Sequence, residues 1–120
     1  WNVEVPADCP ECAMSNVSWA TYLFDKYPDT RFGLMSFTQD TVISRYMAIE
    51  GPAFQAALID LVTTSYDGKN NAHYYVAEGS DHVLLGQLTS LNQNGVSLLS
   101  WIVAWANGTA AWDSVRPGPN

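Results

Sequence analysis

Two short apolar segments of this 120-residue chain are each followed by a side chain that can take part in catalysis. The first spans Arg31 to Phe37 and leads to Asp40, and the second spans Ala72 to Ala77 and leads to His82. Nearly continuous apolar runs of this length are typical of strands buried on both faces of a parallel sheet. Polar groups that follow such strands gather at the carboxyl edge of the sheet, so we expect Asp40 and His82 to meet there.

Helical patterns surround and separate these two strands. Caps, breakers and apolar periodicity predict helices from Asn16 to about Tyr27, Asp40 to Glu50, Pro52 to Ser65, and Leu98 to about Ala106. We also expect a short helical turn within Leu88–Asn94 and an unstructured tail from Val115 to Asn120. The order helix, strand, helix, helix, strand, helix predicts an α/β fold with parallel strands and flanking helices.

Two strands do not complete such a sheet, because strands that are apolar on both sides need neighbours on both sides. We therefore expect residues 1–120 to be the C-terminal portion of one domain whose upstream strands are missing from this sequence.

Composition excludes several classes of function. The hydrophobic fraction of 48%, with five Trp and six Tyr, is typical of a folded domain. The net charge is −7 and the five basic residues are scattered, which argues against a nucleic-acid partner. No apolar run approaches the roughly 20 residues of a membrane span. The acidic, weakly charged composition favours an extracellular or periplasmic protein.

Cys9 and Cys12 form a Cys-Pro-Glu-Cys pair with three interpretations. They form a local disulfide or bond to upstream partners, they are half of a zinc site, or they are a thioredoxin-like redox motif. The zinc interpretation lacks a second Cys or His pair at ligand spacing. The redox interpretation needs a preceding strand; Trp1 to Val5 is a candidate, but Pro6 and Asp8 interrupt it.

Asp40 and His82 are the residue types that ester hydrolysis by a serine requires. A histidine takes the hydroxyl proton, and a carboxylate fixes its tautomer and stabilises the imidazolium. α/β-Hydrolases carry these groups in the chain order Ser, Asp, His. No Gly-x-Ser-x-Gly sequence is present; Ser36 falls inside a strand and Ser80 inside a turn. We therefore expect the chain alone to have no triad activity.

Simpler interpretations of the same residues remain open. Asp40 can serve only as a helix N-cap, worth roughly 1 kcal/mol. His82 can be a turn residue bonded to backbone, and His73, at the start of a strand, is expected to be structural. Asp81 competes with Asp40 as the acid that orients His82, although Asp81 directly precedes His82 and the side chains of adjacent residues seldom face each other well. Asp67 is expected to be a turn residue.

Four segments carry a resemblance to a known family. They are Arg31–Asp40, Gly79–His82, Gly95–Trp101 and Trp112–Val115. In order and spacing they resemble the C-terminal part of the pectin acetylesterase family, which includes the Notum-type carboxylesterases. The resemblance covers most of the chain, from about Trp1 to Val115.

This resemblance implies that Asp40 is the triad acid and His82 the triad base. The nucleophile would lie upstream, in a Gly-x-Ser-Ala-Gly-Gly motif that also helps to form the oxyanion hole. The implied reaction removes an acetyl or acyl group from a small-molecule or carbohydrate ester, with no metal or organic cofactor. Val83 stands where many plant members have Cys, which is more similar to bacterial members.

Three hypotheses follow. The first is the C-terminal segment of a serine carboxylic-ester hydrolase that cleaves an acetyl or acyl ester of a polysaccharide, with this segment supplying Asp40 and His82. The second is a small stand-alone α/β binding or thiol-redox module that uses Cys9 and Cys12. The third is a hydrolase-fold relative that has lost its catalytic serine.

Overall fold

The computed structural model describes residues 4–118. Residues 1–3, which belong to the candidate strand at the start of the chain, and residues 119–120 of the tail lie outside the described residues. Glu4 and Val5 have no regular secondary structure. Among the described residues, no helix has the length and apolar character needed to cross a membrane.

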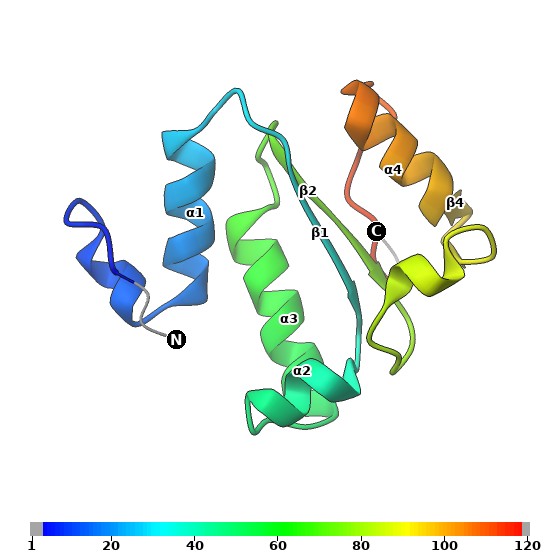
Figure 1. The fold of residues 1–120 in the computed structure, drawn as a ribbon, viewed down its shortest axis with the longest axis horizontal. Coiled ribbons are helices and arrows are strands. Elements are labelled where there is room, and N and C mark those ends of the chain that lie inside the picture. Colours follow the sequence, from blue (N-terminus) through cyan, green and yellow to red (C-terminus); the bar gives the residue numbers. More distant parts are fainter. Residues whose placement is uncertain (1–3, 119–120) are drawn as a thin grey trace.

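A parallel pair of strands lies between helices, in a mixed α/β arrangement (Figure 1). The elements in chain order are the 3₁₀ helix η1 (Pro10–Ala13), α1 (Asn16–Lys26), β1 (Phe32–Phe37), α2 (Thr41–Tyr46), α3 (Pro52–Ser65), β2 (Ala72–Ala77), the 3₁₀ helix η2 (Leu84–Gln87), β3 (Asn92–Gln93), β4 (Val96–Ser97) and α4 (Leu98–Asn107). The predicted order of helices and parallel strands is confirmed. Strands β1 and β2 pair in register from Phe32 opposite Ala72 to Phe37 opposite Ala77.

Each face of the strand pair has its own hydrophobic core. Tyr74 and Val76 of β2 pack with Phe54 and other residues of α3. Tyr75 and Ala77, which point to the opposite face, pack with residues such as Trp101 of α4. Because both faces are covered, β2 is almost wholly buried, which explains its nearly continuous apolar sequence.

The local signals that predicted the helices act as expected. The Ser15 hydroxyl accepts a hydrogen bond from the backbone N–H of Ser18, at the start of α1. The Ser97 hydroxyl accepts from the N–H of Ser100, at the start of α4. Gly108, with φ +63°, ends α4 in the left-handed conformation that glycine tolerates.

Helix α2 is shorter than predicted, ending at Tyr46 instead of Glu50. Ala48 adopts φ +54°, and the N–H of Ile49 bonds to the carbonyl of Ser44. These are the marks of a Schellman ending, here formed with alanine instead of glycine. The early end turns Ile49 toward the core beside α3, so tertiary packing overrides the local helical pattern.

The helical turn expected within Leu88–Asn94 is confirmed only at its start, where the N–H of Leu91 bonds to the carbonyl of Gln87 at 2.8 Å, and it does not extend to Asn94. The 3₁₀ helix η2 comes earlier, and Asn92–Gln93 pairs with Val96–Ser97 in an antiparallel hairpin. Asn94 and Gly95 form its two-residue turn, with φ +52° and +82°. Positive φ at both positions is what an Asn-Gly hairpin turn requires.

The tail is also more ordered than predicted, because Val115 joins the sheet. Its N–H bonds to the carbonyl of Tyr74 and its carbonyl accepts from the N–H of Val76, each at 2.8 Å. This forms a parallel bridge beside Tyr75, on the edge of β2 that β1 does not use. Val115 is only 5% exposed, so the bridge also buries an apolar side chain.

Candidate functional site

The segments that follow β1 and β2 are held together beyond the ends of the strands. The N–H of Thr38 bonds to the carbonyl of Ala77, and the N–H of Gln39 bonds to the carbonyl of Gly79, each at 2.9 Å. The Thr41 hydroxyl donates to the carbonyl of Ser80 at 3.1 Å. The two loops therefore run side by side, which brings Asp40 and His82 to the same edge of the sheet.

Asp40 uses its two carboxylate oxygens for different partners. Oδ1 accepts hydrogen bonds from the N–H groups of Val42 and Ile43, at 3.0 and 2.9 Å, and so caps α2. Oδ2 lies 2.9 Å from Nδ1 of His82. Asp40 is only 3% exposed, which shields these interactions from water. The residue is thus both the N-cap and the histidine partner that the sequence offered as alternatives.

His82 is oriented by Asp40 and bonds to a side chain instead of the backbone. An ionised carboxylate can only accept hydrogen bonds, so the proton of a neutral imidazole lies on Nδ1. Nε2 is then an acceptor, and it has no hydrogen-bond partner within residues 4–118. The His82 side chain is 42% exposed. The arrangement can take a proton at Nε2 while the adjacent carboxylate stabilises the positive charge.

Gly79 permits the sharp turn that leads from β2 to His82. Its φ is +150°, and a Cβ atom at this position would lie 2.7 Å from Cδ1 of Phe37. Any other residue would therefore clash with the buried end of β1 and take up a strained backbone conformation. The sequence marked this segment as a turn, but its closeness to Phe37 arises only from the tertiary fold.

A cavity of about 600 Å³ lies beside the Asp40–His82 pair. Both residues line it, together with mostly apolar side chains from β1, α2 and the loop after it, α3, and the start of α1. The apolar members include Leu34, Ile43, Met47, Phe54, Leu58 and Leu61. An apolar cavity with a few convergent polar groups at one place is a typical binding site, and neither the cavity nor its lining was apparent from the sequence.

The remaining polar residues around this edge have other partners. The Ser36 hydroxyl, although it also lines the cavity, donates to the carbonyl of Phe37 at 3.0 Å. Asp81 accepts from the side-chain amide of Gln87 at 2.9 Å and does not compete for His82. The carboxylate of Asp67 accepts from the hydroxyl of Tyr74 at 2.9 Å, a role beyond that of a turn residue.

His73 lies in a different environment from His82. Its Nδ1 is 3.3 Å from the hydroxyl of Ser114 and 3.7 Å from a carboxylate oxygen of Asp113. Its ring packs edge-on against Trp112, with 4.5 Å between ring centroids. Desolvation lowers the pKa of His73, and the nearby charge of Asp113 opposes this effect. These contacts agree with the structural role expected for His73.

Cys9 and Cys12 are joined by a disulfide, the first of the three interpretations. The two residues are 1% and 2% exposed; Cys9 is the N-cap of the 3₁₀ helix η1 and Cys12 lies within it, so neither opens an α-helix. No group of three or more His, Cys, Asp or Glu side chains suited to a metal ion occurs in residues 4–118.

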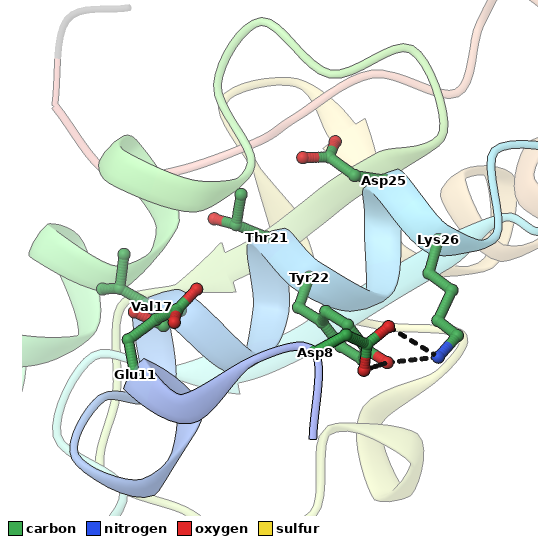
Figure 2. Close-up of a pocket in the computed structure, with 8 residues that line it drawn as sticks. Asp8, Glu11, Val17, Thr21, Tyr22, Asp25 and Lys26 are labelled. Carbon is green, nitrogen blue, oxygen red and sulfur yellow. Dashed lines mark hydrogen bonds and ion pairs between the residues drawn. The ribbon is translucent and has the colours of Figure 1, made fainter. Parts of the chain in front are cut away.

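Polar and charged residues make up most of the lining of a hollow between η1 and α1 (Figure 2). There the Tyr22 hydroxyl donates to Asp8 at 2.8 Å, and the Lys26 ammonium contacts both residues. The hydrogen bond from Tyr22 is the main reason that the pKa of Asp8 is lowered. All three groups face solvent, so we interpret the cluster as surface ion pairing that fastens η1 to α1.

Comparison with known proteins returned no relative of this chain. No protein-family model matches it, and no curated protein or solved structure matches it. A proposal for function therefore depends on the geometry of the Asp40–His82 pair and on the resemblance carried by the surrounding motifs.

Proposed function

We propose that residues 1–120 are the C-terminal segment of a serine carboxylic-ester hydrolase with an α/β-hydrolase-like sheet. In this proposal Asp40 is the triad acid and His82 is the triad base. The observation that carries it is the 2.9 Å contact between Oδ2 of Asp40 and Nδ1 of His82, at the carboxyl ends of two adjacent parallel strands.

The serine would come from the upstream part of the same domain. As its hydroxyl oxygen attacks the ester carbonyl carbon, Nε2 of His82 takes the hydroxyl proton and Asp40 stabilises the imidazolium. His82 then returns that proton to the leaving alcohol oxygen, which leaves an acyl-serine. Water repeats the sequence as nucleophile, gives one proton to His82, and releases the carboxylic acid as the serine regains its proton.

The proposed substrate is an acetyl or acyl ester, borne by a polysaccharide. This narrower choice comes from the resemblance to the pectin acetylesterase family, and the proposed location is extracellular or periplasmic. The Cys9–Cys12 disulfide supports that location, because disulfides persist in oxidising compartments. A thiol-redox role for the same cysteines has less support, since both are buried.

The decisive experiment replaces His82 in the natural polypeptide, meaning the full-length protein to which residues 1–120 belong, and measures hydrolysis of p-nitrophenyl acetate. His82→Ala should lower kcat by a factor on the order of 10⁶ while the circular dichroism spectrum stays unchanged. Asp81→Asn is the matched control, because this neighbour contacts Gln87 instead of His82. Unchanged hydrolysis by the His82→Ala protein would rule out the proposal. Residues 1–120 alone should be inactive, because the proposed serine lies outside them.

A further inference from the structure

Within residues 4–118, strand β1 has a partner on only one side. Among the described residues it pairs with β2 alone. The N–H of Phe32 bonds to the carbonyl of Asn71, and the N–H of Thr38 bonds to the carbonyl of Ala77. Because the direction of the backbone groups alternates along a parallel strand, the N–H and C=O groups of Leu34 and Ser36 also point toward β2. The N–H and C=O groups of the alternate residues Gly33, Met35 and Phe37 therefore point away from β2.

This free edge lacks the features that keep edge strands from pairing. Natural edge strands are shortened, bulged, or interrupted by proline and charged side chains. β1 is six residues long, contains no proline and no charged residue, and keeps its register along its whole length. The outer edge of β2, in contrast, is bridged at its centre, where Val115 pairs with Tyr75.

The apolar cavity runs along the same free edge. Three consecutive residues of β1, Leu34 to Ser36, line it. Because consecutive side chains point to opposite faces of a strand, a cavity that touches all three lies beside the strand and not over one face. Its other walls come from Val17 of α1, Leu61 of α3 and Ile43 of α2, so this is an apolar groove bordered by open hydrogen-bonding groups.

Helices α1 and α3 together cover more width than the two strands β1 and β2 provide. Helices α1 and α3 lie on the same side of β1 and β2, and α1 packs against α3 (Figure 1). Packed helices lie about 8–10 Å apart and strands about 4.8 Å apart, so two helices cover about four strands. With α3 covering β1 and β2, α1 covers space beyond the free edge of β1.

We propose that this groove takes up a further strand, apolar on both faces and parallel to β1, from the part of the hydrolase domain outside residues 1–120. The inference rests on the proposed function for the source of the strand. A parallel direction brings the carboxyl end of the new strand to the edge that holds Asp40 and His82. A loop at this carboxyl edge of the enlarged sheet can then present the nucleophile to Nε2 of His82.

Amide hydrogen exchange in the natural polypeptide, followed residue by residue by NMR, tests this inference. The amides of Gly33, Met35 and Phe37 should exchange within about tenfold of those of Leu34 and Ser36, which serve as internal controls bonded to β2. An alternating pattern, with those three amides exchanging more than about a hundredfold faster, overturns the inference whatever the length of that polypeptide.

Dilution distinguishes the proposed strand from a second copy of the chain. Protection supplied within one polypeptide should not change with protein concentration, whereas protection that disappears on dilution assigns the edge to self-association and overturns the inference. The readout does not depend on turnover, so His82→Ala should keep the exchange pattern. Failure of the proposed function would instead appear as undiminished hydrolysis by that variant.

Discussion

Oδ2 of Asp40 lies 2.9 Å from Nδ1 of His82, across 42 residues of chain. The other oxygen of the same carboxylate caps α2 through the N–H groups of Val42 and Ile43. The start of α2 therefore fixes the carboxylate, and the carboxylate in turn fixes the imidazole. Stability and the orientation of the His82 imidazole therefore depend on one buried side chain.

Two substitutions of Asp40 separate these roles. Asp40→Ser should keep the helix cap, because serine caps about as well as aspartate, and the free energy of unfolding should fall by no more than about 1 kcal/mol. Asp40→Asn should keep the shape of the side chain. Both variants lose the carboxylate that orients His82, so kcat for ester hydrolysis should fall by a factor on the order of 10⁴.

Steady-state kinetics and urea unfolding of the natural polypeptide check this separation. Asp40→Ala supplies the reference, since it removes both the cap and the partner of His82. Near-normal kcat in Asp40→Ser would show that the carboxylate acts only as a cap.

Gly79 offers a second test, through the turn that leads to His82. Gly79→Ala should lower the free energy of unfolding by about 1–3 kcal/mol, because the φ of +150° is strained for alanine and its Cβ would meet Phe37. Displacement of the turn should also shift the NMR signals of the His82 ring. Gly86→Ala is the matched control, since a Cβ there meets nothing within 4 Å. Equal stability of the two variants would contradict the structure of this turn.

The elements with strong local signals were predicted from sequence. Helices α1 and α4 have serine caps, α3 begins with Pro52, and β1 and β2 are apolar runs bounded by polar turns. The meeting of Asp40 and His82 followed from the parallel arrangement of the two strands. These features depend on short segments or on a general rule of sheet geometry, so the sequence was sufficient.

The features that sequence reasoning missed depend on distant contacts. Val115 stands near Pro117 and Gly118 and resembles a tail residue, yet it pairs with a strand about forty positions earlier. Helix α2 ends early because Ile49 is needed in the core beside α3. Similarly, the closeness of Gly79 to Phe37 arises when β1 and β2 come together. No local pattern reports such contacts, which is why they were not predicted.

His73 should make stability depend on pH. Its pKa is lowered in the folded state by desolvation, so the unfolded chain, with a pKa near 6.5, binds protons more readily. The stabilisation is complete above about pH 6.5 and is lost as the pH falls toward the lowered folded value. Urea unfolding at pH 7.5 and 5.5 should therefore show a larger decrease for the original protein than for His73→Gln.

The groups that surround His73 determine what else contributes to this pH dependence. Asp113 lies near His73 and opposes the lowering of its pKa, while Ser114 and Trp112 are neutral over this range. Asp113→Asn should therefore lower the pKa of His73 further, measured by NMR titration of the ring. A His73 pKa at or above 6.5 in the original protein would refute the assigned burial.

Val115 tests whether the C-terminal segment is part of the sheet. Val115→Ala should lower the free energy of unfolding by about 1–2 kcal/mol, because the side chain is 5% exposed and belongs to the core beneath α4. Val103→Ala removes the same atoms from a half-exposed site on α4 and should change it by no more than about 0.5 kcal/mol. Val115→Pro also removes the N–H that bonds to the Tyr74 carbonyl, so it should destabilise the protein more than Val115→Ala. It should also speed hydrogen exchange of the Val76 amide, which donates to the carbonyl of Val115. Equal effects of the alanine substitutions at Val115 and Val103, measured by urea unfolding, would show that the segment lies outside the cooperative fold.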